Sequence, residues 1–263
     1  MLHRKFIRTK FGNDYYIHFI HGNREKYNII FDMSKLQFPP DNRDSFNNNL
    51  DRVHHVILRM LKIVSQISKE LDISIWLEYG TMLGAVRHKG FIPWDTEADI
   101  GILRKDFEKL CKNAKRLLPE DIFFQTKHSD PYYSADQFIE AKFRDKYSNY
   151  TTFRQKNPNL KWHNGIQIDV FVFDAYILSG EKCLINNYEK LLTGCKSYYR
   201  FEEIEEILEY QFEDAEFYIP SGYDSYLKRT YGNYMELPPE ECRISEETDV
   251  YNPCDHPEIL YWK

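Results

Sequence analysis

The 263-residue chain contains no long uninterrupted run of apolar residues. A helix that crosses a bilayer needs about 18 or more such residues in a row, so the sequence predicts no transmembrane segment. The N-terminal stretch also lacks the apolar core of a secretory signal peptide. We therefore expect a cytoplasmic protein.

Basic residues are not in excess either. The chain has 35 Lys and Arg against 41 Asp and Glu, which gives a net charge of -6. A protein that binds nucleic acid through its phosphates needs a strongly basic face. The composition therefore argues against nucleic acid as a main partner.

Cysteine is scarce and irregularly placed. The five cysteines are widely spaced, and none of them forms a CxxC pair. An odd number without close pairs indicates neither a disulfide framework nor a zinc finger. We expect reduced thiols.

Aromatic residues are abundant, with 20 Tyr and 18 Phe, and hydrophobic residues make up 42% of the chain. This content is enough to bury one sizeable core. Apolar residues spaced by three and four predict a helix over 51–71. Shorter patterns predict strands at 73–77, 97–103, 122–125, 138–144 and 166–173, with helices at 80–87, before Pro119, over most of 182–211 and at 223–231.

These interleaved elements predict an α/β (α+β) fold, with a mixed β-sheet flanked by helices. Three short β-prone runs in 5–33 predict an additional N-terminal β-meander. We expect residues 1–49 to form a β-rich accessory segment and linker, and residues 50–263 to form the main domain.

Acidic residues alternate at one place in the chain. In an extended segment Asp95, Glu97 and Asp99 project to one side, and Asp169 interrupts an apolar run that is predicted to be a strand. Carboxylates held close together repel one another unless a cation lies between them, and their hard oxygen atoms favour Mg²⁺ or Mn²⁺. The alternative is that Glu97 and Asp99 form the wet face of an edge strand and that Asp169 pairs with Arg or Lys.

Two features nearby suit phosphate binding. Gly80 and Thr81 follow a predicted strand and begin a helix, where backbone N–H groups and the helix dipole favour an anion. Arg87, His88 and Lys89 form a basic cluster at the end of that helix. The alternative for this cluster is an ordinary solvated helix end, where cations are favoured without any ligand.

The stretch EYGTMLGAVRHKGFIPWD at 78–95 resembles the signature of the LicD/fukutin family. Members of this family have a nucleotidyltransferase fold and transfer phosphocholine, ribitol phosphate or similar groups from CDP-linked donors. Two further blocks match in the same order: 143–146 with 162–165 and 168–171, then 223–224, 231–234 and 237–239. The resemblance spans roughly residues 55–243.

The resemblance implies roles for particular residues. Gly80 and Thr81 match the family's turn, Glu97 and Asp99 its paired acids, and Asp169 its third acid. These three acids are the expected ligands of Mg²⁺ or Mn²⁺, and Asp95 is expected to belong to the same catalytic group. Candidates for binding the donor and its phosphates are Arg87, His88, Lys89, Arg144, Lys146, His163 and Asn164.

The family string W-D-D-D-I-D is altered here. Residues 94–99 of this chain read W-D-T-E-A-D. Glu97 therefore stands where the family has Asp. Its extra methylene displaces the carboxylate relative to a metal that tolerates little variation in distance.

The resemblance implies a metal-dependent phosphotransferase that uses a CDP-linked donor and a glycan or lipid-linked saccharide as acceptor. Two alternatives remain: a catalytically inactive nucleotide- or glycan-binding module of the same fold, and a metal-dependent glycosyltransferase. Trp94 and Trp162 are expected either to stack on a base or a choline-like cation, or to pack in the core.

Overall fold

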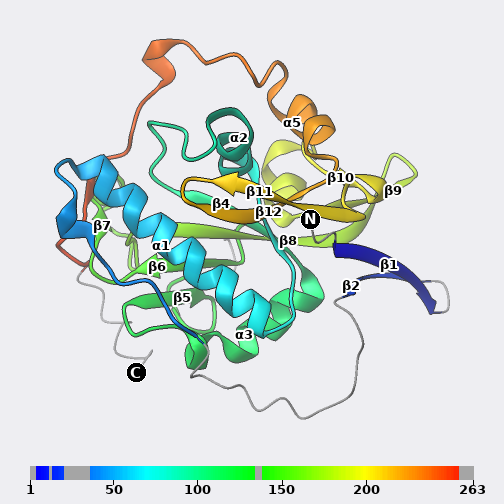
Figure 1. The fold of residues 1–263 in the computed structure, drawn as a ribbon, viewed down its shortest axis with the longest axis horizontal. Helices are drawn as coiled ribbons and strands as arrows, with labels where there is room; N and C mark the ends of the chain where they lie inside the picture. Colours follow the sequence, from blue (N-terminus) through cyan, green and yellow to red (C-terminus); the bar gives the residue numbers. More distant parts are fainter. Residues whose placement is uncertain (1–3, 12–13, 21–35, 134–137, 255–263) are drawn as a thin grey trace.

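The computed structural model describes residues 4–11, 14–20, 36–133 and 138–254 (Figure 1). Its centre is a seven-stranded mixed sheet in which β10, β9, β8, β4 and β3 follow one another, while β6 pairs with β8 and β5 with β6. Strands β4 and β8 are parallel and the other neighbours are antiparallel. The bounds are β3 Ile75–Leu77, β4 Ala98–Leu103, β5 Ile122–Thr126, β6 Ala141–Asp145, β8 Gln167–Leu178, β9 Glu181–Ile185 and β10 Tyr199–Arg200.

Helices flank this sheet. The longest, α1, begins after Asn48, whose side chain accepts a hydrogen bond from the backbone of Asp51 at 2.8 Å. Its apolar side packs against β6 and β8, whereas α3 contacts β4 and β8 (Figure 1). The helices are α1 Asn49–Glu70, α2 Tyr79–His88, α3 Arg104–Leu117, α4 Thr151–Lys156 and α5 Tyr223–Tyr231, with 3-10 turns at Arg43–Ser45, Phe201–Glu203 and Glu240–Cys242. The predicted α/β fold with a mixed, helix-flanked sheet is confirmed.

A second sheet has the order β12-β11-β1-β2. Its bounds are β1 Arg4–Phe11, β2 Asp14–Ile20, β11 Glu206–Phe212 and β12 Ala215–Pro220; a short pair, β7 Asn149–Tyr150 and β13 Thr248–Asp249, lies apart from it. The first two runs of the predicted meander form the β1–β2 hairpin, and the third run lies outside the described residues. Because β1 pairs with β11, the N-terminal hairpin extends a sheet of the main domain. The boundary at residue 49 stays a prediction.

The helices predicted over most of 182–211 are wrong. This segment contains β9, a π-helical turn at Glu189–Thr193, β10 and the start of β11. Its second part, EEIEEILEY, is rich in good helix formers, but β11 pairs with β12 from Ile207 to Phe212. Pairing with distant and neighbouring strands therefore overrides the local helix preference. The helix predicted at 223–231 is confirmed as α5.

Among the residues that the structure describes, no helix is both long enough and apolar enough to span a membrane.

Candidate active site

The acidic segment before β4 is extended, and its side chains alternate between two environments. Thr96, Ala98 and Ile100 are buried, whereas the intervening Asp95, Glu97 and Asp99 are only partly buried. The hydroxyl of Tyr150 donates to the main-chain carbonyl of Thr96 at 2.6 Å. This buried hydrogen bond holds the acidic segment in place. The three acids therefore share one face, as the alternation predicts.

Asp169 joins these acids from the neighbouring strand. Asp99 on β4 and Asp169 on β8 are register partners in the parallel pair, so their side chains leave the same face of the sheet. Asp169 is 4% exposed. Desolvation, followed by the charges of Glu97 and Asp169, raises the pKa of Asp99 well above its usual range. The fold has brought carboxylates from two separate motifs into one interacting group.

Glu97 and Asp95 have raised pKa values as well. Desolvation, followed by the charge of Asp169, raises the pKa of Glu97 to about 7, and the Gln167 amide donates to Glu97 Oε2 at 2.6 Å. Desolvation raises the pKa of Asp95 to about 6. Acids with pKa values near neutrality are suited to proton transfer.

The start of α2 lies against this group. A Cβ atom on Gly80 would lie 3.3 Å from Asp95 Oδ2 and 3.7 Å from Asp99 Oδ2, so the absent side chain allows the helix to approach the acids closely. The hydroxyl of Thr81 accepts a hydrogen bond from the backbone N–H of Asp99 at 2.7 Å. The turn and the acids that were predicted separately therefore form one site.

Two members of the site were missed by the sequence analysis. One is Gln167, described above; the other is Lys142 on β6, which is the register partner of Asp169. The Lys142 ammonium lies 2.5 Å from Asp169 Oδ1. Both residues alternate with apolar neighbours within strands, but only the strand register reveals which acid each one contacts.

Within the described ranges, no three His, Cys, Asp or Glu side chains are arranged as a complete set of metal ligands. The ion pair with Lys142 occupies one oxygen of Asp169, and the Gln167 amide occupies one oxygen of Glu97. After desolvation, the charges of Glu97 and Asp169 are the main causes that raise the pKa of Asp99, so these carboxylates interact although the protein alone does not complete a ligand set.

A cavity of about 260 Å³ borders the site at Glu97, the one of the four acids that lines it. Its polar wall includes Glu97, Lys142, Arg144 and Gln167. The remaining wall is mainly aromatic and apolar: Phe138, Ile139, Tyr150, Phe153, Trp162, Tyr188 and Leu192, with Glu246. A small organic group can therefore be held next to the carboxylates.

Comparison of the sequence with known proteins identifies related proteins. Residues 72–221, more than half of the chain, match the model of the LicD/FKTN/FKRP nucleotidyltransferase domain. The chain belongs to the LicD/FKTN/FKRP family. The family match contains the start of α2, the acidic segment, β6 and β8, and therefore every carboxylate of the site.

The match with this chain covers different shares of the relatives' lengths. The lipopolysaccharide cholinephosphotransferase LicD of Haemophilus influenzae is 23% identical over 250 residues, which covers 71% of this chain and 91% of the relative. The mouse ribitol-5-phosphate transferase FKTN is 24% identical over 179 residues, which covers 68% of this chain but 33% of the relative. An uncharacterized protein of Rickettsia typhi, RT0683, is 33% identical over 99 residues, 35% of this chain and 30% of that protein. At the level of the family, LicD and FKTN indicate a transferase of phospho-alcohol groups.

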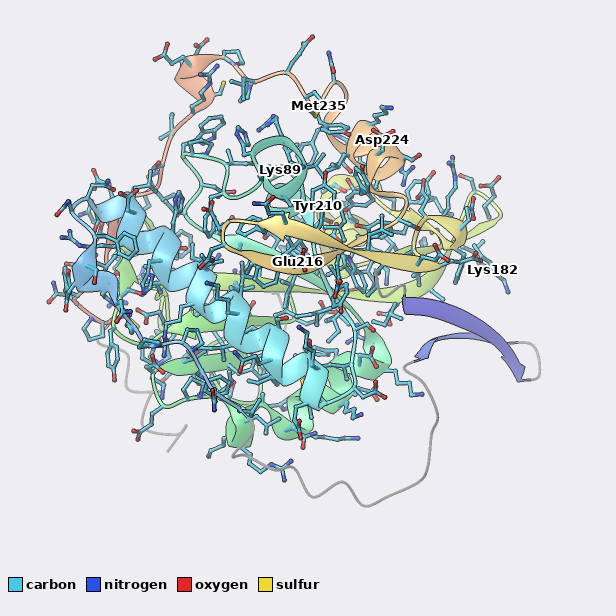
Figure 2. All side chains as sticks on the ribbon, in the orientation of Figure 1. Lys89, Lys182, Tyr210, Glu216, Asp224 and Met235 are labelled. Carbon is cyan, nitrogen blue, oxygen red and sulfur yellow. The ribbon has the colours of Figure 1, made fainter. Side chains whose placement is uncertain are left out.

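In the part of the chain that the structure describes, the basic cluster at the end of α2 forms its hydrogen bonds with residues other than the four site acids. The Arg87 guanidinium donates to the carbonyl of Tyr234 at 2.8 Å and to the ring of His88 at 2.9 Å. The Lys89 ammonium lies 3.1 Å from the Tyr210 hydroxyl and 4.5 Å from the centre of that ring (Figure 2). These contacts join α2 to β11 and to the segment after α5. The predicted roles of Arg87, His88 and Lys89 in phosphate binding stay predictions.

The other predicted donor-binding residues lie in different places. Arg144 borders the cavity and is held by hydrogen bonds to Gln125 Oε1 and to the carbonyl of Gly165, both at 2.8 Å. His163 is buried, with Nδ1 2.9 Å from the sulfur of Cys254. Lys146 follows β6 and is not part of the cavity wall. Asn164 is buried and donates to the carbonyl of Tyr150 at 3.3 Å.

Proposed function

We propose that this chain is a divalent-metal-dependent phosphotransferase that moves a phospho-alcohol group from a CDP-linked donor to a hydroxyl of a glycan or lipid-linked saccharide. One observation carries the proposal: Asp95, Glu97, Asp99 and Asp169 form one interacting group, in which Asp95 and Asp99 lie against Gly80 at the start of α2. Family membership and the phospho-alcohol transferases among the relatives support the type of reaction.

The chemistry of the acids fits Mg²⁺ or Mn²⁺. Desolvation, followed by repulsion from neighbouring carboxylates, raises the pKa values of Glu97 and Asp99, and a bound cation relieves this repulsion. Mg²⁺ is commonly held by one or two carboxylates together with substrate phosphates, so an incomplete protein ligand set is compatible with it. Glu97, Asp99 and Asp169 are the residues that would hold the ion. When bound, the ion would neutralise charge on the donor phosphates.

The chain's own groups have the remaining roles. The N-terminus of α2 at Gly80 and Thr81 directs backbone N–H groups and a positive dipole end toward the phosphate position. Arg144, fixed at the cavity wall, adds positive charge. A carboxylate, for which Asp169 is our candidate, takes the proton of the acceptor hydroxyl. The acceptor oxygen then bonds to the phosphorus that carries the alcohol, the bond from that phosphorus to CMP breaks, and CMP leaves.

The reaction product distinguishes this proposal from its alternatives. CDP-choline, CDP-ribitol and CDP-glycerol would each be incubated with the protein and Mn²⁺ or Mg²⁺, and the released nucleotide would be identified. Release of CMP supports the proposal, because the bond between the two phosphates has been cleaved. A nucleoside diphosphate released from a nucleotide sugar would indicate a glycosyltransferase instead. Binding of nucleotide without any turnover would indicate an inactive module.

A further inference from the structure

Asp169 lies on the middle strand of three, between a carboxylate and a cation. Its register partner on β4 is Asp99, and its register partner on β6 is Lys142. The Lys142 ammonium lies 2.5 Å from Asp169 Oδ1, and the two side chains are only 11% and 6% exposed. An ion pair this buried is not an incidental surface contact.

Among the described residues, Lys142 is the one cation that forms an ion pair with any of the four site acids. Four carboxylates crowded at low exposure repel one another, and removal of a buried partner charge leaves the other charge uncompensated. Lys142 therefore acts as a counter-ion that stabilises the acids when no metal is bound.

The same contact is incompatible with a metal ion at that oxygen. Mg²⁺ and Mn²⁺ need carboxylate oxygens at close to 2 Å, and a second cation already bound at Asp169 Oδ1 would repel them. Lys142 also borders the cavity, and its side chain is a flexible four-carbon stem with three donors. It can therefore turn from Asp169 toward a donor phosphate in the cavity without a change in the backbone.

We propose that Lys142 exchanges partners during binding: it neutralises Asp169 in the empty site and contacts a donor phosphate once a divalent ion occupies the acids. This inference rests on the proposed function. The exchange makes metal binding and donor binding cooperative. The ion releases Lys142 from Asp169, and the donor phosphate then stabilises the released ammonium.

The test compares Lys142→Met with the unaltered protein by calorimetric titration. Mn²⁺ is titrated without nucleotide, and CDP is titrated at saturating Mn²⁺. Loss of the competing cation should raise the Mn²⁺ affinity by about tenfold or more, whereas loss of a charge-assisted phosphate contact should lower the CDP affinity by roughly ten- to a hundredfold. Lys62→Met is the matched control. Lys62 lies on α1, its ammonium pairs with Asp214 at 2.6 Å, and it lines no part of this cavity. It should change neither affinity.

The double variant Lys142→Met with Asp169→Asn covers the case in which the single variant does not fold. It removes both charges of the pair, so the fold should be retained, and its Mn²⁺ affinity should fall at least tenfold below that of the unaltered protein.

The proposal is overturned if Lys142→Met leaves the Mn²⁺ affinity unchanged or lowered, or leaves the CDP affinity unchanged. Unaltered Mn²⁺ binding by the double variant overturns it too. Failure of the proposed function itself would give a different result, in which the unaltered protein binds neither Mn²⁺ nor CDP. The proposed function would then be wrong, and the role proposed for Lys142 would be wrong with it.

Discussion

Asp99 and Asp169 are direct neighbours across the parallel pair β4 and β8, although they come from separate motifs of the sequence. Their side chains leave the same face of the sheet, and Asp99 lies next to Gly80 at the N-terminus of α2. Parallel pairing of these two strands is therefore the structural basis of the proposed site.

Glu97 stands where the family motif has Asp, and its longer side chain reaches the Gln167 amide at 2.6 Å. We expect Glu97→Asp to preserve or improve turnover, measured as CMP release. Glu97→Gln and Asp99→Asn should each lower it by about 10²-fold or more, because oriented charge is lost near the reacting phosphate. An equally large loss in Glu97→Asp would mean that the pocket has adapted to the glutamate.

Arg87 donates to the main-chain carbonyls of Tyr234 and Glu236, at 2.8 and 3.2 Å. From these contacts we expect Arg87→Ala to lower the free energy of unfolding by roughly 1–3 kcal/mol and to leave CDP affinity nearly unchanged. Lys89→Ala, which removes a contact with Tyr210, should have a smaller effect on stability. Chemical denaturation and calorimetry measure the two quantities. A tenfold loss of CDP affinity in either variant would support the phosphate contact predicted from the sequence.

Glu78 is fully buried and accepts hydrogen bonds from Trp76 Nε1 at 2.6 Å and from the Tyr199 hydroxyl at 2.9 Å. Burial raises the pKa of Glu78 from 4.5 to about 7. Between these two values the folded chain keeps a proton that the unfolded chain has lost, so the free energy of unfolding falls as the pH rises through this window.

We therefore expect urea denaturation in EDTA to show lower stability at pH 8 than at pH 5. Glu78→Gln should reduce this difference, because the glutamine has no proton to lose. Part of the difference should remain, since Asp95 and Glu97 also have raised pKa values. An undiminished pH dependence in Glu78→Gln would contradict the assignment.

Trp162 lines the cavity and packs edge-on against Tyr133, with ring centres 5.8 Å apart. If it stacks on the organic part of the donor, Trp162→Ala should weaken binding of CDP by roughly 1–3 kcal/mol, the range observed for base stacking on aromatic residues. Trp94→Ala is the control, because Trp94 lies under Arg243 and outside the cavity wall. Equal CDP affinities in the two variants would assign Trp162 to core packing.

The sequence predicted those parts of the site that are encoded locally. Alternation along 95–99 places three acids on one face, and the glycine at position 80 marks the close approach of α2. The contacts of Lys142 and Gln167 depend on strand register, which local patterns do not specify. Local preference also failed at β11, where helix-forming residues lie in a strand because β12 pairs with it.

The most direct test of the proposed function is the metal dependence of CMP release. With Mn²⁺ or Mg²⁺ present, the protein should release CMP from at least one of CDP-choline, CDP-ribitol and CDP-glycerol when a glycan acceptor is supplied. EDTA should abolish the release, excess metal should restore it, and Asp169→Asn should lower it by about 10²-fold or more. CMP release that continues undiminished in EDTA would contradict the account.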